Sequence, residues 1–142
     1  MKNLSILKLA QAFDRCGANS VDDAHAYKIL KMKSELRKAQ KAINERAEEL
    51  SKEVFADDAE AALARDVQAT KSPELLEKIR RFNSLHETLM EDETDINVKR
   101  VPFKVWRTFT KENDMKLGLV EAEIEGVFFD AYEGEKAGDA VS

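Results

Sequence analysis

Residues 21–54 contain neither glycine nor proline, and this uninterrupted stretch limits the fold more than any other feature. Within it, the apolar residues that recur at seven-residue intervals are Ile29, Leu36, Ile43 and Leu50. Met32 and Ala39 fill intermediate positions. This spacing predicts a long helix with one apolar stripe, here called the seam, which must be buried against another helix. Arg46 interrupts the seam, and Ser20 is expected to cap the start of the helix.

A second amphipathic helix is predicted over residues 73–93. Ser72 precedes Pro73 and an acidic residue, which is the order typical of a helix start because serine caps the helix and proline suits its first position. The residues of its apolar side are Leu75, Ile79, Phe82, His86 and Leu89. The alanine-rich stretch 55–69 between the two helices indicates a third, shorter helix that begins after Asp57 and Asp58.

The charge pattern predicts how the two long helices pair. Residues 28–41 hold six basic side chains and one acid, whereas residues 45–60 and 87–95 are strongly acidic. The basic residues at the beginning of the later helix are Lys71, Lys78, Arg80 and Arg81. An antiparallel arrangement sets opposite charges side by side, and a parallel arrangement sets like charges together. We therefore expect a long antiparallel helical hairpin.

The ends of the chain are expected to form a small α+β cap on this hairpin. An N-terminal helix would carry apolar residues from Ile6 to Phe13, start at Ser5 and end at Gly17 in the left-handed conformation. Alternation of Ile96 and Val98 with polar residues predicts a short strand near 95–101.

Two C-terminal helices would complete the cap. Pro102 would begin the first of them, and the second would run from Leu117 to Phe129. The fold class is thus mainly α, with a single domain over residues 1–133 and a flexible tail over residues 134–142.

Composition excludes several classes of protein. A chain of 142 residues suits one domain. The single cysteine, Cys16, excludes an intramolecular disulfide, and no apolar run is long enough to cross a membrane. The first residues lack the apolar stretch and cleavage site of a signal peptide. We therefore expect a soluble protein that is cytoplasmic or packaged in a particle.

Few residues could support catalysis or bind a metal. His86 lies on an apolar helix face, where a core or boundary histidine is more common than a ligand or base. His25 follows Asp22 by three residues, which favours a surface contact, and Cys16 is expected to be a buried small hydrophobe rather than a reactive thiol. The acids of residues 91–95 lack the residue order of a calcium loop. We predict no enzyme activity, no catalytic residue, no metal and no cofactor.

The basic stretch 28–41 raises the alternative of a nucleic-acid-associated regulator. The candidate phosphate-contacting residues are Lys31, Lys33, Arg37, Lys38 and Lys41. Their charges fall on several helix faces, Tyr27 is the only aromatic residue among them, and the net charge of the chain is −5. Nucleic acid is therefore the less favoured partner.

Aromatic residues are concentrated in the last forty positions, which contain six of the ten. One interpretation is a small core that closes one end of the hairpin. The other is an exposed anchor for a protein partner, because tryptophan and arginine are frequent among the residues that dominate interfaces. The partner-binding candidates are Phe103, Trp106, Arg107 and Phe129.

The order of these parts resembles a family of small uncharacterised proteins of tailed bacteriophages and prophages. The likeness rests on residues 34–39, 95–103 and 117–129, and the alanine-rich helix departs from it. The resemblance implies no activity and no residue roles. It implies a phage or prophage accessory or assembly factor, located in the cytoplasm of a bacterial host or associated with the virion.

Together these features favour a non-enzymatic protein-interaction module, either an assembly factor or an inhibitor of a host protein. Its partner would be a phage or host protein, because an acidic surface and a long rigid hairpin suit docking to a basic protein. A homo-oligomer is also expected. The charge of Arg46 must reach water or an acid, and a second copy would cover surplus seam, because the hairpin is long for so few apolar residues per turn.

Overall fold

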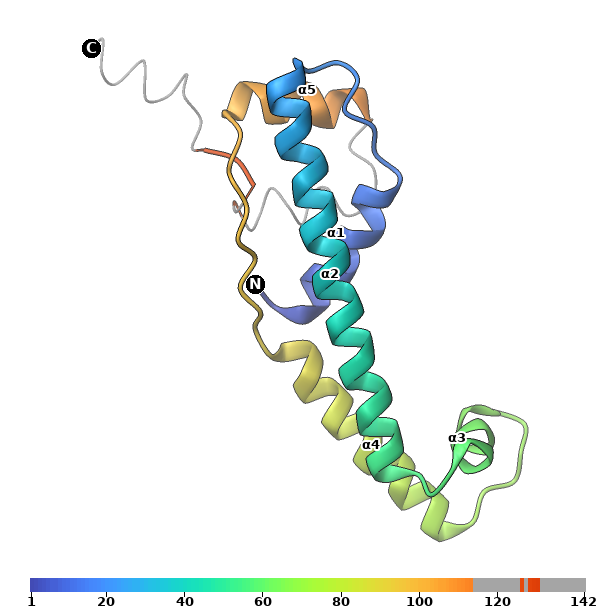
Figure 1. Cartoon of the computed structure of the whole chain (residues 1–142). Coiled ribbons are helices and arrows are strands. Elements are labelled where there is room, and N and C mark those ends of the chain that lie inside the picture. Colours follow the sequence, from blue (N-terminus) through green and yellow to red (C-terminus); the bar gives the residue numbers. More distant parts are fainter. Residues whose placement is uncertain (114–125, 127, 131–142) are drawn as a thin grey trace.

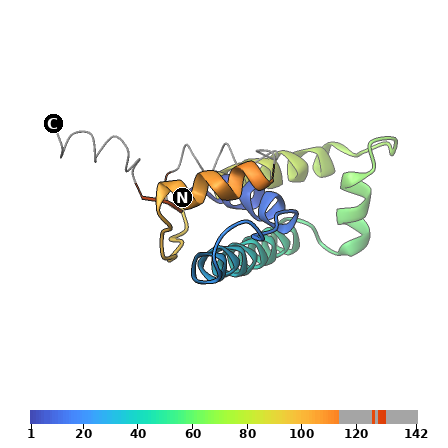
Figure 2. The same ribbon diagram turned by 90° about the horizontal axis from the view of Figure 1, so that it is seen from above.

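The computed structural model describes residues 1–113, 126 and 128–130, and this part of the chain is mainly helical, as predicted. Its helices are α1 (Asn3–Asp14), α2 (Asp23–Val54), α3 (Asp58–Arg65), α4 (Pro73–Glu91) and α5 (Phe103–Glu112). Figure 1 shows α4 beside the C-terminal half of α2, with α3 at that end of the molecule and α1 and α5 at the other. Seen from above, α1 lies between α2 and α5 (Figure 2).

Helix α2 buries the seam that the sequence predicts. Ile29, Met32, Leu36 and Ile43 are all nearly inaccessible to solvent, and Leu50 is half-buried. Arg46 is exposed, so its charge reaches water from the edge of the seam. The cap differs from the prediction, because Asp22 rather than Ser20 is the residue before the helix, and the Ser20 hydroxyl donates instead to the Glu112 carboxylate.

Helix α1 begins earlier than predicted. The residue before it is Lys2, and Ser5 is buried within the helix. The Asn3 backbone N–H donates to the Asp92 carbonyl oxygen over 2.9 Å, so the end of α4 satisfies a donor that we expected a serine cap to satisfy. The Asn3 side chain is also buried and donates to the Leu89 carbonyl oxygen over 2.8 Å. The N-terminus is therefore tied to the C-terminal end of α4.

The start of α4 matches the sequence signals closely. Pro73 occupies the first turn, and the Ser72 hydroxyl accepts a hydrogen bond of 3.1 Å from the Leu75 N–H. The preceding helix, α3, has an equivalent cap in which the Asp57 carboxylate accepts from the Glu60 N–H over 2.7 Å. Helix α4 ends at Glu91, slightly before the predicted end.

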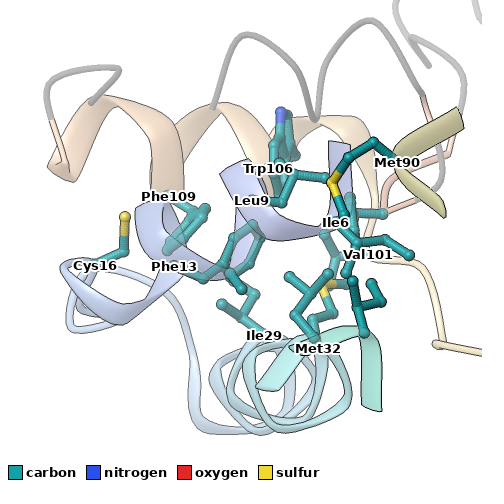
Figure 3. Packing of buried hydrophobic residues seen from close by; sticks show 14 of the residues in the cluster. Ile6, Leu9, Phe13, Cys16, Ile29, Met32, Met90, Val101, Trp106 and Phe109 are labelled. Carbon is teal, nitrogen blue, oxygen red and sulfur yellow. The ribbon is translucent and has the colours of Figure 1, made fainter. Parts of the chain in front are cut away.

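Two separate hydrophobic cores hold the helices together. The larger core joins α1, most of α2, the end of α4, Val101, α5 and Phe128. Figure 3 shows side chains of α1, α2, α4 and α5 meeting in it, with Phe13 and Ile29 near its centre. The smaller core lies where α2, α3 and α4 meet, and its buried members are Val54, Phe55, Ala61 and Leu75.

The strand predicted near residues 95–101 does not form. Residues 94–100 have no regular secondary structure, and only Val101 pairs, in an isolated parallel bridge with Phe129. Ile96 and Val98 are half-buried because they pack on the larger core from an irregular segment. The alternation of apolar and polar residues over 95–99 therefore reflects burial of one side of an irregular segment, not a strand. The β component of the predicted α+β cap is wrong.

One of the two predicted pairings between basic and acidic blocks forms an ion pair in the described residues, because Lys78 of α4 pairs with Glu60, in the acidic block 45–60, over 2.6 Å. No ion pair joins residues 28–41 to residues 87–95 in that part of the chain, and Glu91 pairs instead with Lys2. Helix α1 packs on both α2 and α4, and its Asp14 accepts a 2.7 Å bond from the Arg37 side chain. Arg37 of the basic block thus pairs with α1 rather than with the acids of residues 87–95.

Gly17 does not adopt the left-handed conformation predicted for it, since Gly126 is the glycine with a positive φ among the described residues. Arg15 follows α1 in a right-handed conformation. Most of the predicted helix from Leu117 to Phe129, and the predicted tail over residues 134–142, lie outside the described residues.

Candidate functional site

Helix α5 presents an aromatic face because Phe103, Trp106 and Phe109 recur every three residues. Pro102 precedes the helix, and its fixed backbone suits a helix start, where an N–H would lack a partner. The backbone N–H of Trp106 donates to the Pro102 carbonyl oxygen over 3.0 Å and closes the first turn of the helix. The helix thereby turns two of these aromatic side chains into the larger core.

Trp106 and Phe109 are core residues with no exposed surface. The Phe13 ring of α1 lies 6.2 Å from the Trp106 ring and 5.7 Å from the Phe109 ring, measured between centroids. Figure 3 shows these three side chains converging between α1 and α5. Trp106 is therefore not the exposed anchor that one interpretation of the sequence offered, because α1 and Phe128 enclose its ring.

Residues 128–130 lie against the entry to α5. The Val101 N–H donates to the Phe128 carbonyl oxygen over 3.1 Å, and the Asp130 N–H donates to the Val101 carbonyl oxygen over 2.9 Å. These two hydrogen bonds fix which side each aromatic ring takes. Phe128 enters the core completely, whereas Phe129 stays half-buried and stacks on Trp106 with ring centroids 5.2 Å apart.

Three of the predicted partner-binding residues form one surface, here called the aromatic patch: Phe103, Arg107 and Phe129. The Phe103 ring meets the Phe129 ring edge-on at 5.6 Å. The Arg107 guanidinium carbon lies 6.0 Å from the centre of the Phe103 ring, within the range of a cation–π contact. Both phenyl rings are half-buried and Arg107 is exposed. The fourth candidate, Trp106, forms the buried base of the patch.

The Trp106 indole N–H is buried and has no hydrogen-bond partner among the residues that the structure describes. An unsatisfied buried donor of this kind costs about 1–3 kcal/mol, so its presence is a measurable burden on the fold. The stacking of the Trp106 ring between phenyl rings opposes that cost.

The residues of the nucleic-acid alternative are divided between two environments. Arg37 donates to Asp14, and Lys33 reaches the Asp14 carbonyl oxygen over 3.4 Å. Lys38 pairs with Glu35 over 3.2 Å at the surface. Lys31 and Lys41 are exposed and contact no acid among the described residues. The structure thus does not gather all five into one phosphate-binding row.

The other candidate groups have structural roles. The Asp22 carboxylate contacts His25 as expected, and this hydrogen bond lowers the pKa of Asp22. His86 is half-buried, with its ring 5.7 Å from that of Phe82. Cys16 is buried, and its thiol donates to the Ala12 carbonyl oxygen. Within the described residues no group of three or more metal-ligating side chains comes together.

A polar connection between the ends of α1 and α5 was not foreseen from the sequence. The Glu112 carboxylate accepts from the Ser20 hydroxyl and from the backbone N–H groups of Asn19 and Ser20. The Ser20 bond, followed by that from Asn19, lowers the pKa of Glu112. Asn113 is buried and exchanges hydrogen bonds of 3.0 Å with both backbone groups of Gly17. These contacts hold the α1–α2 loop against the end of α5.

Two concave surfaces that include residues of α2 were also not predicted from the sequence. A hollow of about 530 Å³ lies where α2, α3 and α4 meet, above the Phe55 and Phe82 rings. A smaller one, of about 290 Å³, lies between the start of α2 and the segment containing Val98 and Lys99. Neither is formed within a single element, so no local pattern would have indicated them.

Comparison with protein-family models, with curated proteins and with solved structures gave no match. No helix in the described ranges has the length and apolar character needed to cross a membrane.

Proposed function

We propose that this chain is a non-enzymatic protein-interaction module that binds its partner through the aromatic patch. The observation that carries the proposal is the stacking of half-buried Phe129 on fully buried Trp106, with exposed Arg107 at the edge. Aromatic and arginine side chains dominate the energetics of protein interfaces. A partner that covered the patch would bury apolar area that the chain itself leaves open to solvent.

The base of the patch is already packed against other rings before a partner binds, which favours affinity. Trp106 is held by contacts with Phe13, Phe109 and Phe128, so the ring beneath Phe129 does not need to be ordered when a partner arrives. Each side chain that is already fixed spares an entropic cost of about 0.5–1.5 kcal/mol on association. The positive charge of exposed Arg107 favours a partner that carries a negative charge at this edge of the patch.

The rest of the fold would serve as a scaffold. In this proposal α2 and α4 act as the long antiparallel hairpin, joined through α3, and carry the patch at the end opposite α3. The phage and prophage resemblance makes the partner a phage or host protein. The module would then be an accessory or assembly factor, or an inhibitor of a host protein, in the bacterial cytoplasm or in the virion.

The alternative of a nucleic-acid-associated regulator has less support. It requires the basic residues of α2 to face solvent together, but Asp14 of α1 engages both Arg37 and Lys33. A regulator that used the whole stretch 28–41 would have to release these contacts first.

Affinity capture from a lysate of the native host tests the proposal with a matched pair of variants. Arg107→Glu places an acid in the aromatic patch, and Lys104→Glu makes the same change in charge on an exposed residue of the same helix. We expect the wild-type chain and Lys104→Glu to recover the same proteins, and Arg107→Glu to lose at least one of them. If both variants recover everything that the wild type recovers, the patch is not the binding surface.

A further inference from the structure

Three lysine side chains line the 290 Å³ hollow at the start of α2. Lys28 and Lys31 come from successive turns of that helix, and Lys99 comes from the segment that runs beside it. No acidic residue within the described part of the chain lines this hollow. None of the three ammonium groups has an ion pair or a hydrogen bond to another described residue.

This arrangement differs from that of the other cations near it. Arg37 and Lys33 contact Asp14, and Lys38 contacts Glu35, so each of these positive charges is offset by an acceptor within the chain. Three like charges around one concave surface repel each other, and a bound anion removes that repulsion. The positive end of the α2 helix dipole acts in the same direction, because Ala24 of its first turn also lines the hollow.

The remaining lining is apolar or aromatic. Met32 is completely buried and Val98 is half-buried, so they form the apolar part of the wall. Tyr27 lines the hollow while 67% of its surface stays exposed, which leaves a ring face open to a planar group. The surface therefore combines a cluster of positive charges with an aromatic ring available for stacking, the two features by which proteins hold the phosphates and bases of single-stranded nucleic acids.

We infer that this hollow binds a nucleoside phosphate, with the phosphate among Lys28, Lys31 and Lys99 and the base against Tyr27. The volume lies at the lower limit of small-molecule sites, roughly 300 Å³, and so fits one nucleotide. The nucleotide can be free or can be one residue of a single strand, because both present the same phosphate and base. This site shares no residue with the aromatic patch, so it is a function additional to the proposed one.

Isothermal titration calorimetry with four probes tests the inference on the full chain. The probes are inorganic phosphate, adenosine, adenosine monophosphate and a short thymidine oligonucleotide. We expect adenosine monophosphate to bind more tightly than either phosphate or adenosine, because only it engages both parts of the site. An oligonucleotide that binds at least tenfold more tightly than the mononucleotide would identify the natural ligand as a single strand.

Three variants locate the binding. Lys99→Gln should weaken adenosine monophosphate about tenfold through loss of one charge-assisted contact, and Tyr27→Ser should reduce its affinity to that of phosphate. Lys52→Gln, a change at an exposed lysine of the same helix outside the hollow, should have no effect. The inference fails if neither the mononucleotide nor the oligonucleotide binds, or if Lys52→Gln weakens binding as much as Lys99→Gln does.

Discussion

Replacement of Trp106 by alanine separates a core residue from a surface anchor. The side chain has no exposed surface and packs against the rings of Phe13, Phe109, Phe128 and Phe129. Truncation of a buried tryptophan costs about 3–5 kcal/mol. The same change removes the unsatisfied indole N–H, which returns part of a penalty of about 1–3 kcal/mol. We therefore expect a net loss in the free energy of unfolding of about 2–4 kcal/mol.

Denaturation by urea, followed by far-ultraviolet circular dichroism, measures this loss. For a chain of this size each kcal/mol lowers Tm by about 2–4 °C, so thermal unfolding should report a decrease of about 4–16 °C. Phe129→Ala is the matched control, because that ring is only half-buried and its removal should cost less. A Trp106→Ala variant within about 1 kcal/mol of the wild type would refute the core assignment.

Three further outcomes follow from the packing and the charges. Ile43→Asp should unfold the chain, since it puts an unpaired charge at a position only 2% exposed, whereas Arg46→Asp at the exposed edge of the seam should leave Tm nearly unchanged in the same melt. The depressed pKa of Glu112 means that its bonds stabilise the fold above the ordinary value of 4.5 and are lost as pH falls through the lower folded pKa. Glu112→Gln should accordingly lower Tm at neutral pH but not at a pH below the folded pKa of Glu112. An equal decrease in Tm at the two pH values would contradict the predicted pH dependence. Sedimentation velocity should show concentration-dependent self-association, and a single 16.1 kDa species over a wide concentration range would exclude the predicted homo-oligomer.

Local pattern was enough to predict the helices of residues 1–113 and the buried side of α2. The seven-residue repeat of Ile29, Leu36 and Ile43 identifies their burial because the spacing of a helix places them on one side. Likewise, Ser72 and Pro73 identify the start of α4 because capping depends on residues only three positions apart. Both signals depend only on residues close together in the sequence, which is why the structure confirms both predictions.

Contacts between distant segments could not be predicted in this way. The Asn3 side chain does not cap its own helix but donates to the carbonyl oxygen of Leu89 in the last turn of α4, eighty-six positions away. Glu112 holds the loop at Ser20 by the same kind of long-range contact. No sequence motif surrounds Asn3 or Glu112, so their hydrogen-bond partners can be identified only from the arrangement of the helices.

The aromatic patch also depends partly on local sequence spacing and partly on a contact between distant segments. The three-residue spacing of Phe103 and Trp106 correctly placed them on one side of a helix. Their separation into a buried base and a half-buried rim depends on Phe129, which the backbone bonds of Val101 bring to that place. The sequence alone could not decide between core and interface, because no local pattern indicates that Val101 pairs with residues 128–130.

Amide hydrogen exchange of the chain, with and without a captured partner, tests the proposed interaction most directly. Binding at the aromatic patch should slow exchange in peptides that cover residues 101–112 and 126–130, and should leave α3 at its rate in the free chain. The Arg107→Glu variant should show no such protection under the same conditions. Protection confined to α3 or to residues 28–41, with residues 101–112 unchanged, would contradict the account.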